Sequence, residues 1–131
     1  MKKALIGTLI GAMVLTAGVC SAFAEEGPKH YKIGYAFANM DENNMRTLRG
    51  VQQYIEELND TGEYDIEFIY TDSQSQVDKQ ISDVESLIAQ SPDLILMSAV
   101  DVVGSIPCLE AIQNAGIIAV DDRGCDTENR D

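Results

Sequence analysis

The pattern of apolar and polar residues predicts strands that alternate with helices. Short apolar runs bounded by turn residues are typical of strands. Between these runs, apolar residues recur at steps of three and four, so they share one face of a helix. The predicted strands are Lys32–Ala38, Tyr64–Tyr70, Leu94–Met97 and Ile117–Val120. The helical stripes are Met45, Leu48, Val51, Ile55 and Leu58, then Val77, Ile81, Val84 and Leu87, then Val103, Ile106, Leu109 and Ile112.

Two of the predicted strands differ in how much of their surface they can bury. In Tyr64–Tyr70, apolar residues alternate with Asp65 and Glu67, so one side is polar, as at the edge of a sheet. The run Leu94–Met97 is apolar throughout, which predicts a strand that is covered on both faces. The two patterns therefore predict an edge strand and an interior strand.

Alternating strands and helices predict an α/β fold with a parallel, doubly wound sheet. The carboxyl ends of parallel strands lie at one edge of the sheet, which we call the carboxyl rim. Ligands of such folds bind beyond this rim. The segments that follow the four predicted strands are all polar: Ala38–Asn44, Asp72–Ser75, Ser98–Asp101 and Asp121–Arg123. The sequence therefore places a candidate ligand site at the carboxyl rim.

Residues 1–24 have the features of a cleaved secretory signal peptide. A basic start precedes the largely apolar stretch Ala4–Val19, and a small-x-small motif ends at Ala24. The stretch is short for a membrane anchor, and an acidic flank follows it. Lipid modification of Cys20 is the other alternative, but a bulky valine precedes this cysteine, where lipoprotein sites need a small residue. We therefore predict export to the periplasm, with cleavage before Glu25.

The charge of the chain and its first loop disfavour nucleic acids and nucleotides as ligands. The formal net charge is −13, which repels phosphate backbones. The predicted turn after the first strand, ANMDENNM, has no glycine, and Asp41 and Glu42 near the helix start would repel a phosphate. A phosphoacceptor domain of the receiver type needs an aspartate at the end of the third strand, where Met97 and Ser98 stand.

Catalytic and metal sites lack their usual residues. His30 is the only histidine and precedes the first predicted strand, so it is expected to be a solvated terminal residue. No G-x-S-x-G elbow is present. The acidic residues Asp121, Asp122, Asp126 and Glu128 do not have the spacing of a calcium loop. We therefore predict a protein that binds without catalysis and uses no cofactor.

The last predicted strand runs into adjacent opposite charges, Asp121, Asp122 and Arg123. A solvated turn or a helix cap would account for them, and so would a polar grip on a ligand. A carboxylate accepts hydrogen bonds from two hydroxyls, while an arginine donates to the same or neighbouring oxygens. Adjacent Asp and Arg also offset each other's charge. This combination favours a neutral polyol such as a sugar.

Three segments resemble the periplasmic sugar-binding proteins of ABC transporters, the ribose/galactose-type group. KIGYAFANMDENNM is similar to the family's first strand and ligand loop, and AIQNAGIIAVDDR to a helix and a strand that ends in an Asp-Arg pair. YTDSQSQVDKQISDVESLIAQSPDLILMSAVD is similar to the second strand, second helix and third strand. The resemblance runs from Lys32 to about Arg123. It implies a type I periplasmic binding fold, a small ligand such as a monosaccharide, and an ABC transporter permease as partner.

The resemblance also implies which residues contact the ligand. The Asp-Arg pair matches the family's sugar-gripping pair, and a serine stands where many members have an asparagine at the end of the third strand. The first loop supplies the other candidates. Asn44 and Met45 stand where many relatives have two aromatic residues that stack on the sugar. This departure points to a ligand that is smaller, differently shaped or not a sugar. The candidate contacts are Asp122, Arg123, Ser98, Glu42, Asn44, Met45 and Asn39.

Two other pairs of residues have structural interpretations. Asp72 and Asp101 each follow a strand and precede a helix, where a carboxylate caps free N–H groups. Cys108 and Cys125 would remain after cleavage and could form a disulfide in an exported protein. Alternatively, Cys108 could be a small buried side chain of the third helix.

The family's proteins have two lobes that close around the ligand. Residues 25–131 correspond to about one lobe, so we expect a truncated or split product, or a fragment. The same fold also delivers ligands to chemoreceptors and membrane sensor kinases, which is the alternative function. A sugar-responsive repressor would need a DNA-binding headpiece where the signal peptide stands. An α/β enzyme would need a catalytic constellation.

Overall fold

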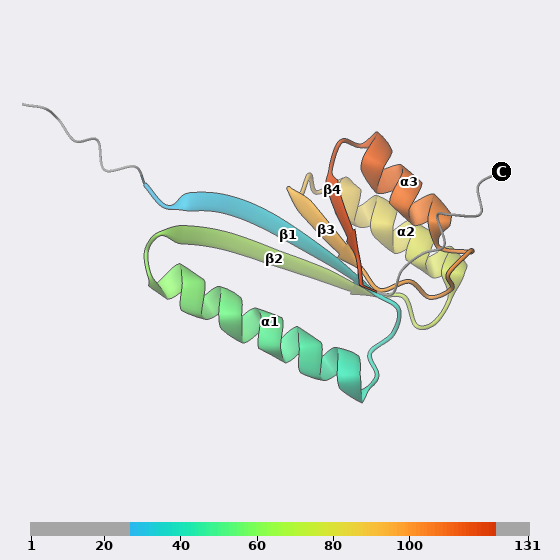
Figure 1. The fold of residues 1–131 in the computed structure, drawn as a ribbon, viewed down its shortest axis with the longest axis horizontal. Helices are drawn as coiled ribbons and strands as arrows, with labels where there is room; N and C mark the ends of the chain where they lie inside the picture. Colours follow the sequence, from blue (N-terminus) through green and yellow to red (C-terminus); the bar gives the residue numbers. More distant parts are fainter. Residues whose placement is uncertain (1–26, 123–131) are drawn as a thin grey trace, which may run out of the picture.

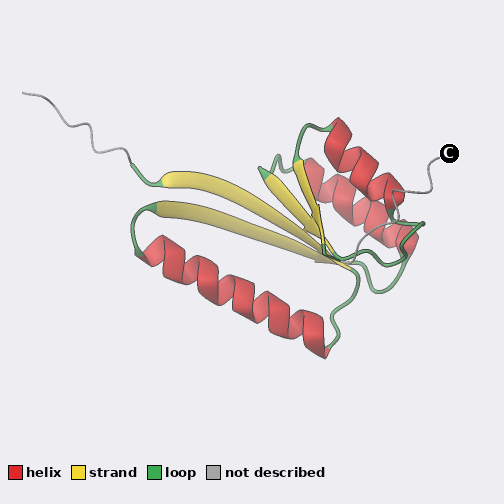
Figure 2. Cartoon of the chain, viewed as in Figure 1, coloured by secondary structure: helices red, strands yellow, loops and turns green. Residues whose placement is uncertain are grey.

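The computed structural model describes residues 27–122, in which strands and helices alternate strictly (Figures 1 and 2). The elements are β1 (Lys29–Phe37), α1 (Glu42–Asp60), β2 (Tyr64–Asp72), α2 (Val77–Ile88), β3 (Leu94–Met97), α3 (Ile106–Asn114) and β4 (Ile118–Asp121). Each helix connects two strands of the same direction, as the hydrophobic pattern predicted.

The four strands form one parallel sheet in the order β2-β1-β3-β4. β1 pairs with β2 along its whole length, from Lys29 opposite Tyr64 to Phe37 opposite Asp72. β3 and β4 are shorter: β3 pairs with β1 from Ile33 to Ala36, and β4 pairs with β3 on its other side. The predicted α/β fold class with a parallel sheet is confirmed, and the alternating strand β2 lies at an edge, as predicted.

α2 and α3 cover one face of the sheet and form the main hydrophobic core with it (Figure 1). A Cβ atom at Gly34 on β1 would lie 3.6 Å from Leu87 of α2 and 3.3 Å from Ile95 of β3, so the absence of a side chain permits this close packing. The buried core residues are Ala36, Val84, Leu87, Ile95, Met97, Ala99, Cys108, Leu109 and Ile112.

The opposite face of the sheet is covered only in part. α1 packs against β2, and none of the described helices lies over β3 and β4 on this side (Figure 1). Leu94 and Leu96 are half-buried there, and Ile118 and Val120 are 65% and 42% exposed. The prediction that the third strand is covered on both faces is therefore wrong within the described residues. Its apolar run faces α2 and α3 on one side only.

Several element boundaries differ from those predicted by one to three residues, and two of these differences change the expected place of a residue. β1 begins at Lys29, so His30 lies within a strand and not in a terminal segment. It is exposed, and its Nδ1 lies 3.0 Å from Asp65 Oδ2 on β2. α3 begins at Ile106, and Val103, which was predicted on the helix, lies in the preceding turn and is 66% exposed. Apolar spacing alone could not separate a helix from an exposed turn at its start.

The predicted signal peptide and its cleavage site lie outside the described residues. Within residues 27–122, no helix combines the length and the apolar character that a membrane crossing requires. α1, with 19 residues, is amphipathic: its half-buried stripe faces β2 and its other faces carry charged residues.

Candidate functional site at the carboxyl rim

At the carboxyl rim, two hydroxyl groups converge on one carboxylate. The Tyr35 hydroxyl on β1 donates to Asp122 Oδ2 at 2.6 Å. Ser98, directly after β3, places its Oγ 2.8 Å from Oδ1 and 2.7 Å from Oδ2 of the same carboxylate. Tyr35 and Ser98 are almost completely buried, whereas Asp122 is exposed. We call these three residues the Asp122 cluster.

The register of the sheet explains why Asp122, and not Asp121, enters this cluster. Asp121 lies opposite Met97 in the β3–β4 ladder, and the Met97 side chain belongs to the core beneath α2 and α3. Asp121 shares that face, and the next residue faces the other way because side chains alternate along a strand. The Asp122 N–H donates to the Met97 carbonyl at 3.0 Å, which extends the ladder. The two neighbouring carboxylates therefore point to opposite faces of the sheet.

Tyr35 was missed as a site residue because it lies inside the apolar run of β1. Its ring stacks on that of Phe37, with centroids 3.7 Å apart and planes inclined by 15°. Phe37 in turn meets Tyr70 of β2 edge-on, at a centroid distance of 6.3 Å. Residue parity was the signal that could have identified it: Tyr35 lies on the same face of the sheet as Asp122, close to the rim.

A buried glutamine holds the loop that follows β3. Gln80 of α2 is completely buried, and its Nε2 donates to the Ser98 carbonyl at 2.8 Å. Its Oε1 accepts from the Val100 N–H at 3.1 Å and from the Ser105 hydroxyl at 2.6 Å. Buried polar groups of this kind are stabilising when every member has a partner. Gln80 thus fixes the backbone that presents Ser98.

A second polar group at the rim, the Asn39 cluster, consists of Asn39, Asn44 and Ser75. Asn39 Nδ2 donates to Ser75 Oγ at 2.9 Å, and Asn44 Nδ2 donates to the Asn39 carbonyl at 2.8 Å. The Asn44 N–H donates to Asp41 Oδ1 at 2.8 Å, which caps α1. Ser75 adopts a φ of 58°, which is uncommon for a residue other than glycine. These bonds join the loop after β1 to the loop after β2.

The remaining predicted contacts lie elsewhere. Glu42 is exposed, and its Oε1 lies 3.4 Å from Arg46 Nη2 one turn along α1. Met45 was predicted in the apolar stripe of this helix, but it is 44% exposed. Arg123 lies outside the described residues. Of the seven predicted contacts, the structure therefore joins two pairs, one in each cluster.

The prediction that Asp72 and Asp101 cap the helices that follow them is wrong, because both carboxylates accept from turn N–H groups instead. Asp72 Oδ1 accepts from the Gln74 N–H at 2.9 Å. Asp101 Oδ1 accepts from the Val103 N–H at 3.0 Å and from the Gly104 N–H at 2.6 Å. In both cases the N–H groups belong to the turn before the helix and not to the helix itself, so the carboxylates stabilise these turns.

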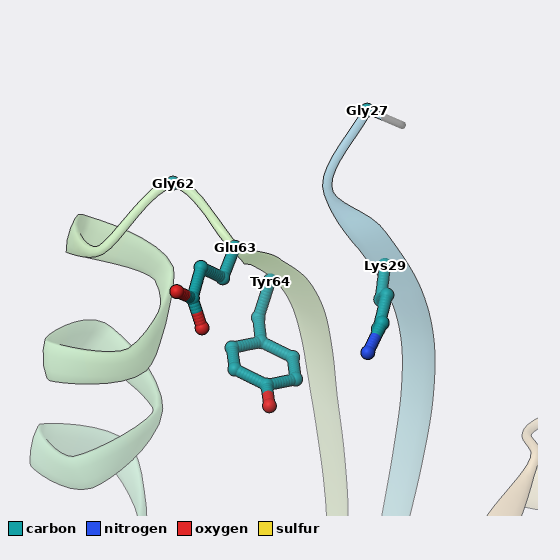
Figure 3. A pocket seen from close by; sticks show the side chains of 5 residues that line it. All are labelled: Gly27, Lys29, Gly62, Glu63 and Tyr64. Atoms are coloured by element: carbon teal, nitrogen blue, oxygen red, sulfur yellow. The ribbon is translucent and has the colours of Figure 1, made fainter. Parts of the chain in front are cut away.

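A shallow hollow lies at the opposite end of the sheet from the two clusters. It is lined by Gly27, Lys29, Gly62, Glu63 and Tyr64, where β1 and β2 begin (Figure 3). The hollow shares no residue with the carboxyl rim. Among residues 27–122, no three His, Cys, Asp or Glu side chains are grouped as in a metal site.

Cys108 is a buried free thiol on α3. Burial raises its pKa from 9.0 to about 11, although a backbone hydrogen bond lowers it, and the nearby Glu85 carboxylate adds to the rise. The thiol is therefore protonated and unreactive at neutral pH. This position agrees with the interpretation of Cys108 as a small buried side chain. Cys125, its candidate disulfide partner, lies outside the described residues.

A family model for the periplasmic binding protein domain matches residues 33–131. The chain belongs to the periplasmic binding protein family. The match includes every residue of both rim clusters, since it begins before Tyr35 and continues beyond Asp122. Among curated protein sequences, none matches this periplasmic binding protein.

Solved structures show the same fold. An ABC transporter solute-binding protein from Mycobacterium smegmatis with bound glycerol is 26% identical, with a TM-score of 0.63 over 75% of this chain and 33% of that chain. A Mycobacterium smegmatis protein in complex with β-D-fucofuranose is also 26% identical, with a TM-score of 0.64 over 77% and 32%. The arabinose-binding protein AraP from Geobacillus stearothermophilus is 22% identical, with a TM-score of 0.59 over 78% and 34%. This periplasmic binding protein chain therefore spans about a third of the length of these relatives.

Proposed function

We propose that this protein captures a sugar or a similar small polar ligand outside the cytoplasm and delivers it to an ABC importer. The Asp122 cluster is the observation that supports the proposal most directly: an exposed carboxylate held by two buried hydroxyls. It lies at the edge where parallel α/β sheets bind their ligands. The family match and the solute-binding relatives support the same function.

The chemistry of the rim suits a ligand that carries hydroxyl groups. The Asp122 carboxylate offers acceptors, and we propose that the neighbouring Arg123 donates to the same ligand. The Asn39 cluster adds amide and hydroxyl groups from two further loops. Asn44 and Met45 supply no aromatic face, so we propose a ligand that is smaller than a pyranose, has a different shape or is not a sugar.

We further propose that the protein acts in the periplasm, without enzymatic activity, after removal of residues 1–24. Family members are extracytoplasmic solute-binding proteins, which supports this location. The basic start, apolar stretch and small-x-small motif of the N-terminus support an export signal.

The 131-residue chain alone is expected to bind sugars weakly. Asp122 is exposed, and the described residues supply one side of a site. Ligand pockets bury roughly 70–90% of their ligand, which one open surface does not achieve. Titration with D-glucose and with arabinose, followed by NMR chemical shifts, detects affinities in the millimolar range. Saturable shifts of the amides at Ser98 and Asp122 are the expected result.

Substitutions at the rim test the roles of the individual residues. Removing one partner of a charge-assisted contact costs about 2–5 kcal/mol, or roughly 30-fold or more in affinity. Asp122→Ala and Arg123→Ala should therefore abolish the sugar-dependent shifts. Asp121→Ala, on the other face of the sheet, is the matched control and should bind like the parent. If Asp122→Ala and Arg123→Ala also bind like the parent, the pair is a solvated turn and the proposal is wrong.

A further inference from the structure

We propose that Tyr35 is a positioning residue whose hydroxyl sets the orientation of the Asp122 carboxylate and thereby the ligand donors that the rim accepts. The consequence for the ligand rests on the proposed function, in which Asp122 contacts it. The orienting role itself is a property of the unliganded protein. Under this proposal, a buried side chain of the sheet contributes to ligand selection without contacting the ligand.

The Tyr35 hydroxyl is held in place from several directions. Its side chain is 3% exposed, and its ring is stacked on Phe37, which is itself completely buried. β1 is an interior strand, paired with β2 and β3 on its two sides at this position. Stacked rings in a paired strand leave the hydroxyl little freedom. The 2.6 Å bond to Asp122 Oδ2 therefore joins an exposed carboxylate to a rigid support.

Ser98 alone does not select one orientation of the carboxylate. Its Oγ is 2.8 Å from Oδ1 and 2.7 Å from Oδ2, so it treats the two oxygens almost equally. The Tyr35 hydroxyl lies 3.4 Å from Ser98 Oγ, and its short bond, at 2.6 Å, goes to Oδ2 of the carboxylate. The tyrosine therefore distinguishes the two oxygens, and the carboxylate plane is defined when both hydroxyls are present.

The two hydroxyls also determine which ligand groups can bind to the Asp122 carboxylate. A carboxylate has about four lone-pair positions, and Tyr35 and Ser98 each donate one proton to them. Both donors approach from the buried side, so the remaining acceptor positions face the exposed side of Asp122. A ligand with two neighbouring hydroxyl donors matches this arrangement. A ligand that presents only acceptors, such as a carboxylate, meets repulsion there.

The orienting role can be tested without any ligand. Tyr35→Phe removes one oxygen and keeps the stacked ring, and Tyr31→Phe removes the same atom from an exposed tyrosine on the same strand and face. Three-bond NMR couplings report the χ1 rotamer of Asp122 in the full chain. We expect one rotamer in the parent and in Tyr31→Phe, and averaged couplings in Tyr35→Phe. A single unchanged rotamer in Tyr35→Phe would overturn the proposal.

A double-mutant cycle measures the strength of the same contact. Hydrogen bonds to charged groups are worth more than neutral ones, and exposure of Asp122 reduces the effect to about tenfold in the unfolding equilibrium constant. Tyr35→Phe should cause this change in the parent and less than about a twofold change in the Asp122→Ala background. Equal changes in both backgrounds would show that the tyrosine acts elsewhere in the fold, which also overturns the proposal.

Affinity for D-glucose then separates positioning from a purely structural bond. At a temperature where all variants are folded, Tyr35→Phe should weaken binding about five- to tenfold, and Tyr31→Phe should not. Coupling in the cycle without a change in affinity would mean that Tyr35 only stabilises the fold. If the parent chain binds neither probe sugar, the proposed function fails, and the rotamer measurement still decides whether Tyr35 orients Asp122.

Discussion

Replacement of Gln80 by leucine removes a side chain that satisfies three buried polar groups at once. The Ser98 carbonyl, the Val100 N–H and the Ser105 hydroxyl would lose their partner. A buried group left without a hydrogen bond costs about 1–3 kcal/mol. Because Val100 is only half-buried, we take about 1–2 kcal/mol for each group, so the three together cost roughly 3–6 kcal/mol. Burying the apolar leucine offsets about 1–2 kcal/mol of this. The net loss is therefore about 2–4 kcal/mol in the free energy of unfolding.

Urea unfolding followed by far-UV circular dichroism measures this loss. With a denaturant slope of roughly 1–2 kcal/mol/M for a small domain, the midpoint should fall by about 2 M. Gln53→Leu is the matched control, because Gln53 is on the exposed side of α1 and bonds Glu57 across one helical turn. It should change the free energy of unfolding by less than about 0.5 kcal/mol.

The result that would refute this reasoning is a Gln80→Leu midpoint equal to that of Gln53→Leu. If Gln80→Leu does not fold, Ser105→Ala provides a graded test. It removes one donor to Gln80 Oε1 and leaves the Val100 bond in place, so it should cost about 1 kcal/mol. An unchanged midpoint for Ser105→Ala would equally contradict the importance of this network.

Two further predictions concern the thiol and the N-terminus. The Cys108 pKa is about 11 in the folded chain against 9.0 as reference, so the folded state keeps a proton that the unfolded state loses. Stability should fall as pH rises from about 9 to about 11, by up to roughly 3 kcal/mol, and this slope should be absent from Cys108→Ala in parallel urea titrations. Export should produce a mature chain that begins at Glu25, as read by N-terminal sequencing. A lipid-modified start at Cys20 would contradict this cleavage.

Features with a local signature were predictable from the sequence. The strands are short apolar runs, and their alternation with amphipathic stripes was enough for the parallel α/β fold. The opposite orientations of Asp121 and Asp122 follow from the alternation of side chains along a strand, and the register of β4 agrees with them. Both features depend only on the order of neighbouring residues.

Features that depend on distant partners were not predictable in this way. Tyr35 and Asp122 are separated by 87 positions, and Gln80 and Ser105 by 25. Tyr35 lies in an apolar strand and Gln80 in an amphipathic helix. Neither segment shows from its own sequence which distant residue its polar group will contact. The prediction that Val103 lies on α3 failed for a different reason. Its apolar side chain continued the spacing of α3, but Val103 lies in an exposed turn that the Asp101 carboxylate stabilises.

The unequal lengths of the strands give the sheet a gradient of stiffness. Within residues 27–122, Lys29–Tyr31 pair with β2 alone, whereas β1 from Ile33 to Ala36 has hydrogen-bonded strands on both sides. Local opening is rarest where strands are paired on both sides and packed against helices, so the N-terminal ends of β1 and β2 fray more readily than the rim. If a ligand binds at the rim, as proposed, it meets side chains that are already ordered. Little conformational entropy would then be lost on that side of the contact, and the affinity would be governed by the groups on the other side of the ligand.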